Sequence, residues 1–138
     1  YDKVTNQMFN LIGDDTLIEG IYANSCQPGA LFSNFRKPNP GMLIRAAEDF
    51  KIDLKNSFIV GDRLTDLQAG LRANLKFVIH VLTGHGRKER NLIKSKVVNF
   101  KDEKNSEYIQ YLVESQKKSK IKFIDNLEEF PNDILIQI

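Results

Sequence analysis

The chain has 138 residues, of which 41% are hydrophobic and 28% are charged, a balance typical of a single domain with a substantial core. Its 20 basic and 18 acidic residues leave a formal net charge of only +2, so charge does not indicate a nucleic-acid partner. A single cysteine, Cys26, excludes an internal disulfide framework and a zinc site built from several cysteines.

No apolar run approaches the roughly 18 residues that a membrane span needs, and no apolar signal region is visible. We therefore expect a cytoplasmic protein with no membrane partner. The chain opens on Tyr1 instead of methionine, and we expect it to be cut from a longer protein.

The first 40 residues are expected to hold a helix, a short strand and a long loop. Apolar residues recur at helical spacing over residues 1–12, and Gly13 interrupts the pattern. A short apolar stretch at 20–23 predicts a strand, and the loop at 24–40 holds three of the four prolines.

A strand–helix–strand unit is predicted in the middle of the chain, after a helix that starts at Asn39-Pro40. The apolar run at 57–60 predicts a strand buried on both faces. Thr65 is expected to cap the following helix, and 77–82 predicts a second buried strand. The expected fold class is therefore α/β with a parallel sheet and a right-handed crossover.

The remaining segments are predicted from shorter patterns. They are a helix at 87–94, a strand or extended loop at 97–100, a solvated connection at 101–107, a helix at 108–113, a strand at 121–124 and a closing helix at 126–136, interrupted near Pro131.

The most informative candidate site follows the strand predicted at 57–60. Gly61 allows a sharp turn or a close approach to a ligand, and Asp62 is a hard oxygen ligand suited to Mg²⁺. Open α/β sheets place ligand sites at the carboxyl ends of their strands, where Asp62 is expected. Asp66 can assist there or can favour the helix N-terminus, and a capped turn without a ligand explains the same residues.

A second candidate is Arg36-Lys37, two cations directly before a helix start. Free N–H groups at a helix start favour an anion, and Pro38 and Pro40 restrict the backbone that carries the cations. Arginine can bind phosphate through two donors, and lysine acts as a point charge. For this pair on its own, an exposed basic loop is the simpler interpretation.

Together, the two candidates suit phosphoryl transfer, which depends on positioning and charge stabilisation. The segments 36–43, 60–70 and 81–86 resemble the haloacid dehalogenase (HAD) superfamily of phosphatases. The similarity is greatest to the subgroup of D-glycero-D-manno-heptose 1,7-bisphosphate 7-phosphatases and histidinol-phosphate phosphatases. Residues 1–30 and 121–134 resemble the family more weakly.

The resemblance implies a Rossmann-like parallel sheet with helices on both faces. It implies that residues 1–138 are the C-terminal portion of a single HAD-like domain whose N-terminal strands are missing from this chain. Residues 87–120 would be an insertion. The missing first strand would lie beside the strand at 57–60, in the middle of the sheet.

The resemblance also implies roles for five residues. Lys37 would stabilise the transferred phosphoryl group, and Arg36 and Arg63 would bind the substrate with it. Asp62 would bind Mg²⁺, with Asp66 as a supporting carboxylate. The implied reaction is Mg²⁺-dependent removal of the 7-phosphate from a heptose 1,7-bisphosphate. The alternatives are histidinol phosphate as substrate, or a non-catalytic remnant or subunit of the same fold that binds a phosphorylated sugar or a partner protein.

The family's nucleophilic and acid/base aspartates lie in an Asp-x-Asp-Gly-Thr-like motif, and no Asp-x-Asp occurs in this chain. Asp14 and Asp15 are adjacent and follow a segment of helical periodicity, which indicates a polar turn. We expect the nucleophile upstream of Tyr1. The chain alone is then expected to be inactive and to self-associate through an exposed sheet edge, and the complete protein to be a monomer.

The other candidate residues favour structural roles. Heptose bisphosphate phosphatases often carry a Cys/His zinc loop before the Arg-Lys-Pro motif, but Cys26 is the only candidate ligand here, so we expect no zinc. His80 lies within a predicted strand and is expected to be a satisfied core histidine. Residues 83–88 are expected at the rim of the site, and 117–122 as a solvated basic face.

Overall fold

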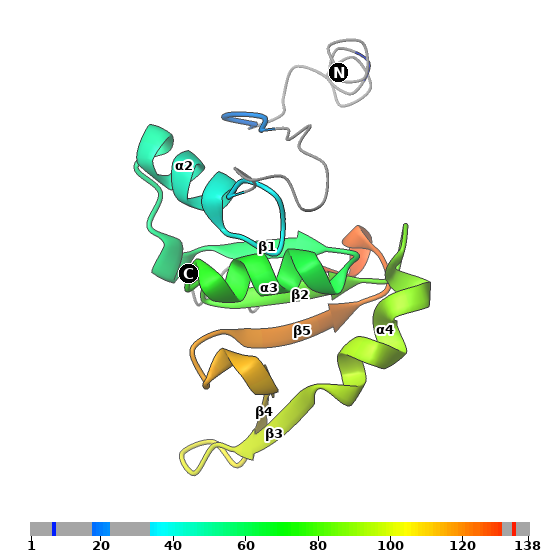
Figure 1. The fold of residues 1–138 in the computed structure, drawn as a ribbon. Coiled ribbons are helices and arrows are strands. Elements are labelled where there is room, and N and C mark those ends of the chain that lie inside the picture. The colour runs from blue at the N-terminus through cyan, green and yellow to red at the C-terminus, as the bar shows by residue number, and fades with distance from the viewer. Residues whose placement is uncertain (1–6, 8–17, 23–33, 131–133, 135–138) are drawn as a thin grey trace.

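The computed structural model describes residues 7, 18–22, 34–130 and 134. Its centre is a five-stranded sheet with the order β1-β2-β5-β4-β3 (Figure 1). The strands are β1 (Phe58–Gly61), β2 (Phe77–Val81), β3 (Val97–Lys101), β4 (Tyr108–Leu112) and β5 (Lys120–Ile124). The α-helices are α2 (Gly41–Phe50), α3 (Leu64–Arg72) and α4 (Gly86–Ser95).

The sheet confirms the expected α/β class, because its strands run in the same direction with one exception. β1 pairs with β2 and β2 with β5 in parallel register, whereas β4 is antiparallel to both β3 and β5. Among the described residues β1 has no partner on its outer edge. An apolar strand of the kind found inside parallel sheets therefore lies at a sheet edge.

The predicted central unit is confirmed, with corrections at the helix starts. α2 begins at Gly41 with Pro40 at its N-cap, and no side chain caps it. Thr65 lies inside α3 and is not its cap, because Arg63 occupies that position. The Arg63 backbone N–H donates instead to the carboxylate of Asp66, three residues on.

Residues 108–113 do not form the predicted helix. Tyr108–Leu112 is strand β4, which pairs with β3 and places Tyr111 opposite Val98 and Ile109 opposite Phe100. Over so few residues, the apolar positions fit a strand in a hairpin as well as one helical face. Pairing with a strand elsewhere in the chain therefore decided the structure of residues 108–112. Residues 97–100, expected to be either a strand or an extended loop, belong to strand β3.

The elements predicted near the two ends of the chain can be compared with the structure only at the few residues described there. Residues 20–22 have no regular secondary structure, so the strand predicted there is wrong. Of the predicted closing helix, residues 127–129 form a 3₁₀ turn capped by the Asn126 side chain, and Ile134 is helical. Its other residues beyond Phe130 lie outside the described part of the chain. The helix predicted at 1–12 lies outside the described residues except for Gln7.

The core has one cluster on each face of the sheet. On the first face, α3 and α4 contribute Leu67 and Ile93, which pack on Val78, Leu112 and Ile121. The other face carries a second cluster, formed by Phe77, Ile79, Val81, Ile124 and Ile134, with Phe58, Val60 and Phe130 packed against it. Strand β2 is buried along its whole length and contributes to both clusters.

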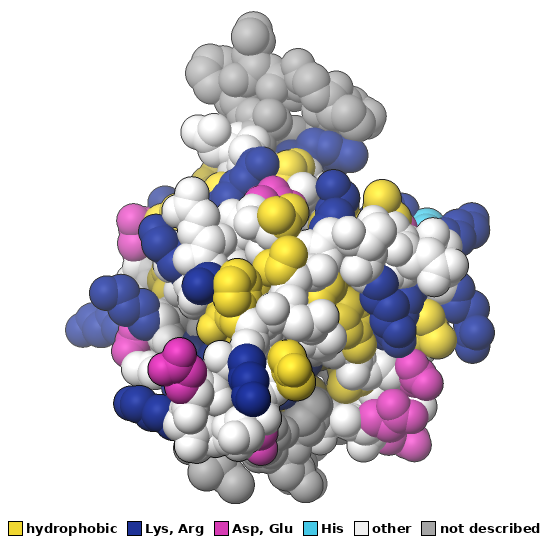
Figure 2. All heavy atoms as spheres, turned by 90° about the horizontal axis from the view of Figure 1, so that it is seen from below, with side chains coloured by type: hydrophobic (Ala, Val, Ile, Leu, Met, Phe, Trp, Pro, Cys, Tyr) yellow, Lys and Arg dark blue, Asp and Glu magenta, His cyan; other side chains and the backbone are white. Residues whose placement is uncertain are grey.

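Residues 86–115 extend the sheet beyond β5. α4 leads into the β3–β4 hairpin, where Phe100 and Tyr111 contact edge to face and Lys117 Nζ lies 3.7 Å from the Phe100 ring centre. Seen from below, toward this end of the sheet, apolar side chains lie between groups of Lys and Arg (Figure 2). No described helix is long and apolar enough to cross a bilayer.

We predict that Leu67→Ala lowers the free energy of unfolding by about 2–5 kcal/mol, because the buried Leu67 side chain joins α3 to the sheet. Urea denaturation measures the change. The matched control is Leu92→Ala, since Leu92 is a helical leucine that is 51% exposed. That substitution should change stability by no more than about 0.5 kcal/mol. Equal losses in the two variants would contradict this assignment of the core.

Candidate active site at the carboxyl ends of β1 and β2

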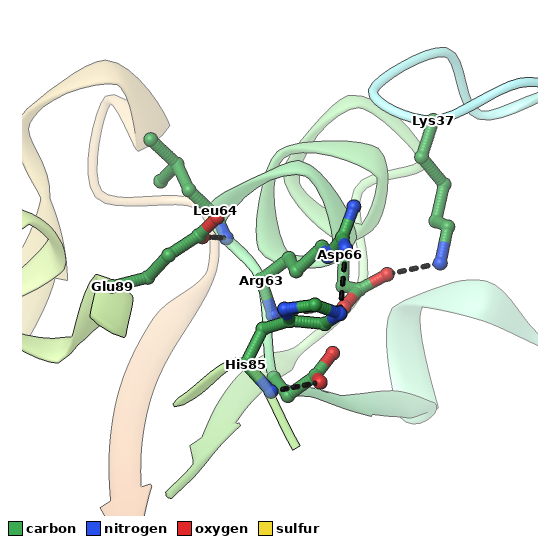
Figure 3. A network of polar contacts seen from close by, with 7 residues as sticks. Lys37, Arg63, Leu64, Asp66, His85 and Glu89 are labelled. Carbon is green, nitrogen blue, oxygen red and sulfur yellow. Dashed lines mark hydrogen bonds and ion pairs between the residues drawn. The ribbon is translucent and has the colours of Figure 1, made fainter. Parts of the chain in front are cut away.

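The residues singled out in the sequence converge at the carboxyl ends of β1 and β2. Asp62 directly follows β1, and residues 82–85 connect β2 to α4. Lys37 reaches the same place from the turn that precedes α2 (Figure 3). Parallel pairing of β1 with β2 creates this proximity, because it brings the two carboxyl ends to one edge of the sheet.

Asp62 is held in its ionised form by the main chain. Its Oδ2 accepts a hydrogen bond of 2.7 Å from the backbone N–H of His85. This hydrogen bond lowers the pKa of the Asp62 carboxyl from its ordinary value, against the opposing effect of partial burial. The carboxylate therefore remains negatively charged at neutral pH.

Gly84 permits this contact. Its φ of +62° lies in the left-handed region, and a Cβ at this position would lie 2.3 Å from Asp62 Oδ2. Any side chain there would meet both a backbone penalty and a collision with the carboxylate. Gly84, in the 83–88 segment, thus lies next to the Asp62 carboxylate.

Asp66 joins two parts of the site. One carboxylate oxygen accepts a 3.0 Å hydrogen bond from Arg63 N–H, and the other accepts from Lys37 Nζ. Gly61 leaves room for this carboxylate, since a Cβ at position 61 would lie 2.2 Å from Asp66 Cβ. Asp66 therefore acts through hydrogen bonds to Lys37 and to the loop after β1.

Arg63 lies beside this group, and Arg36 belongs to the turn that carries Lys37. Arg63 is exposed, and its Nη2 lies 2.6 Å from His85 Nε2 (Figure 3). Because a guanidinium has only donors, His85 Nε2 accepts this hydrogen bond. Arg36 precedes Lys37 in the same turn and is half-buried. Lys37 and Arg63 therefore bring two exposed cations to the site.

His80 is a satisfied core histidine, as predicted. It has no exposed surface, and its two ring nitrogens contact the Asp62 carbonyl oxygen at 3.0 Å and Arg90 Nε at 3.0 Å. Burial lowers the pKa of His80, and the neighbouring Arg90 charge acts in the same direction.

Sequence reasoning missed the contacts that α4 makes with the loop after β1. Glu89 accepts from the backbone N–H of Leu64, at the start of α3. Arg90 reaches His80 and Asp125. A glutamate in the first turn of a predicted helix is a weak signal for such a role, because acidic residues favour helix starts for electrostatic reasons alone.

The described residues fit a Mg²⁺ site in part. Mg²⁺ commonly binds one or two protein carboxylates together with substrate phosphate and water. Asp62 supplies one ionised carboxylate, whereas Asp66 already accepts on both oxygens. Within the described ranges, no three His, Cys, Asp or Glu side chains gather closely enough to hold a metal ion together. Asp14, Asp15 and Cys26 lie outside these ranges.

Residues 34–102, half of the chain, match the model of the HAD-hydrolase-like family. The chain belongs to this family. The matched segment includes Lys37, Asp62, Asp66 and His85. The candidate site therefore lies within the part of the chain that matches the family. The expectation drawn from the resemblance is confirmed at the level of family and fold.

Curated relatives carry a more specific name. The HAD-like chain is 39% identical over 75 residues to the D-glycero-alpha-D-manno-heptose-1,7-bisphosphate 7-phosphatase of Campylobacter jejuni, a match covering 51% of this chain and 42% of the relative. It is 36% identical over 91 residues to the corresponding beta-heptose enzyme of Salmonella typhi, covering 61% and 48%.

A shorter match, to the beta-heptose enzyme of Mesorhizobium japonicum, is 60% identical over 40 residues and covers 29% of this chain and 18% of the relative. The HAD-like chain spans less than half the length of these relatives. No solved structure gives a significant match.

We predict that Asp66→Ala lowers the free energy of unfolding by about 1–3 kcal/mol, because it leaves the Arg63 N–H without its acceptor and breaks the contact with Lys37. Lys37→Met should lower it by less than about 1 kcal/mol, since the Lys37 side chain is 53% exposed. Urea denaturation of both single variants and the double variant measures the coupling. A loss for Lys37→Met as large as that for Asp66→Ala would show that Lys37 has a mainly structural role.

Proposed function

We propose that this HAD-like chain is part of a Mg²⁺-dependent phosphatase that acts on a sugar phosphate. The proposed substrate is D-glycero-D-manno-heptose 1,7-bisphosphate, which would lose its 7-phosphate. The observation that carries the proposal is the convergence of Lys37, Asp66 and the ionised Asp62 at one sheet edge. The names of the curated relatives support this substrate.

The chemistry that these residues can provide is electrostatic. Hydrolysis of a phosphate monoester concentrates negative charge on the transferred group, and fixed cations lower the energy of that state. In this proposal Lys37 binds the phosphoryl oxygens while Asp66 holds the ammonium group in place. Arg36 and Arg63 bind the substrate phosphate from the exposed side.

Asp62 is the proposed Mg²⁺ ligand on this chain. A bound Mg²⁺ would neutralise phosphate charge and align the group for in-line attack. The hydrogen bond from His85 leaves Asp62 ionised and directs its carboxylate, and the lack of a side chain at Gly84 keeps the space beside it open.

The nucleophile of the proposed reaction lies upstream of this chain. An aspartate there would attack phosphorus and break its bond to the sugar oxygen, which takes a proton from the motif's acid/base aspartate and leaves as the hydroxyl. Water would then hydrolyse the aspartyl-phosphate, which releases inorganic phosphate and restores the carboxylate. The absence of any Asp-x-Asp in the sequence supports this assignment and also favours one competing function. That alternative is a non-catalytic binding protein of the same fold, and histidinol phosphate is the alternative substrate for an enzyme.

We further propose a cytoplasmic protein that is monomeric when complete and that uses no zinc, nucleic acid or membrane. The outer edge of β1 is the proposed surface for self-association of the 138-residue chain, because unpaired strand edges pair readily with other strands. Residues 87–120, which contain the β3–β4 hairpin, are proposed as an insertion.

The activity assay compares the 138-residue chain with a protein completed upstream by an Asp-x-Asp strand, using heptose bisphosphate, histidinol phosphate and an aryl phosphate. In the completed protein, Lys37→Ala should lower kcat by on the order of 10²-fold or more, the loss typical of one electrostatic stabiliser. Lys55→Ala, which removes an exposed lysine at the opposite end of β1, is the control. Near-normal turnover by Lys37→Ala would contradict the assignment.

The metal assignment has its own test. Asp62→Asn should shift the midpoint of Mg²⁺ activation to a concentration roughly tenfold higher or more, because it removes the charge of a hard-cation ligand. Activity is titrated against Mg²⁺ for the completed protein and for this variant. Asp53→Asn, which alters an exposed carboxylate away from the site, serves as the control. An unchanged midpoint would make Asp62 a turn residue.

A further inference from the structure

Arg90 links the carboxyl ends of two strands behind Asp62. It lies on α4, and its side chain is only 12% exposed. Its Nη2 donates to the carbonyl oxygens of His80, at the end of β2, and of Ile124, at the end of β5. Its Nη1 forms an ion pair of 3.0 Å with Asp125. The guanidinium is therefore fixed in position from several sides.

The fixed guanidinium determines which nitrogen of His80 carries the proton. Arg90 Nε donates to His80 Nδ1 at 3.0 Å, and a guanidinium nitrogen cannot accept a hydrogen bond. Nδ1 must therefore be the unprotonated nitrogen, so the ring proton is on Nε2. That N–H points to the carbonyl oxygen of Asp62 at 3.0 Å. Arg90 thus sets His80 as a donor to the main chain of Asp62.

Asp62 is consequently held at two points by the segment that runs from β2 into α4. His80 fixes its carbonyl oxygen, and the His85 N–H fixes its carboxylate. Glu89 fixes the next turn through the Leu64 N–H (Figure 3). Each contact restricts a different atom of the loop after β1, so the direction of the Asp62 carboxylate depends on all of them.

A packing role alone does not account for a histidine at this position. The other residues of β2 are Phe77, Val78, Ile79 and Val81, all buried, and His80 is as buried as they are. Replacing a buried polar pair by apolar residues is often neutral for stability. The pairing of His80 with the buried Arg90 is therefore better explained by the way in which it orients Asp62.

We propose that Arg90 and His80 are positioning residues for the cation-binding carboxylate of Asp62, acting through the Nε2–H tautomer of His80. The inference rests on the proposed Mg²⁺ role of Asp62 and adds two residues that do not touch the metal or the substrate. Groups that hold metal ligands in place typically contribute 10- to 100-fold to metal affinity.

The test uses the 138-residue chain and two readouts. Isothermal titration with MgCl₂ gives the Mg²⁺ affinity, and ¹⁵N NMR of the histidine rings identifies the tautomer of His80. Arg90→Met should weaken Mg²⁺ binding by about tenfold or more and should allow the Nδ1–H tautomer to appear. His80→Phe should weaken binding similarly, and His80→Gln, which retains an N–H donor, should recover part of the loss.

Lys94→Met is the matched control, because Lys94 lies one turn further along α4 and its Nζ is 5.5 Å from the centre of the Phe123 ring that Arg90 also covers. It should change neither readout. If Arg90→Met does not fold, Arg90→Lys takes its place. It keeps the charge but cannot reach all of the Arg90 partners at once, so it should also weaken Mg²⁺ binding and allow the Nδ1–H tautomer to appear.

The outcomes separate this inference from the proposed function. Mg²⁺ binding by the wild-type chain that is unchanged in folded Arg90 and His80 variants overturns the inference and leaves the metal role of Asp62 intact. Absence of Mg²⁺ binding by the wild type overturns both, and so does Mg²⁺ binding that Asp62→Asn does not weaken. A wild-type His80 with its proton on Nδ1 overturns the inference whatever the affinity.

Discussion

The carboxylate of Asp66 connects two segments that are 29 residues apart in the sequence, and the geometry of the candidate site depends on it. It closes the first turn of α3 by accepting the Arg63 N–H, and it draws Lys37 toward the end of β1. It occupies this place only because residue 61 has no side chain. Without Asp66, Lys37 would be an exposed lysine on a loop and Asp62 an isolated carboxylate.

The opposite side of the loop is held by a different kind of contact. Asp62 and the start of α3 are tied to β2 and α4 through His80, His85 and Glu89. The loop after β1 is therefore held by a strand of the sheet, β2, and by a helix that packs on the sheet, α4. Such double support suits a site whose chemistry relies on charges being in place before the substrate arrives.

Sequence reasoning predicted the central part of the fold for identifiable reasons. Strongly apolar runs at β1 and β2, and the turn residues between them, determine a parallel unit with little ambiguity. The contact between Lys37 and Asp66 was not predicted, because the turn that carries Lys37 and the start of α3 are 29 residues apart in the sequence. The strand at Tyr108–Leu112 was missed because hairpin pairing, which short patterns do not encode, decided its structure. The links from Arg90 to His80 could not be predicted, since they depend on how α4 crosses the strand ends.

The three carboxylates around this loop share a structural feature. Asp62, Asp66 and Glu89 each accept a hydrogen bond from a main-chain N–H, supplied by His85, Arg63 and Leu64 respectively. Every amino acid except proline provides such a donor. These three hydrogen bonds therefore place no demand on the side chains of residues 63, 64 and 85, so exchanging the exposed side chains of Arg63 and His85 would leave the acidic framework in place.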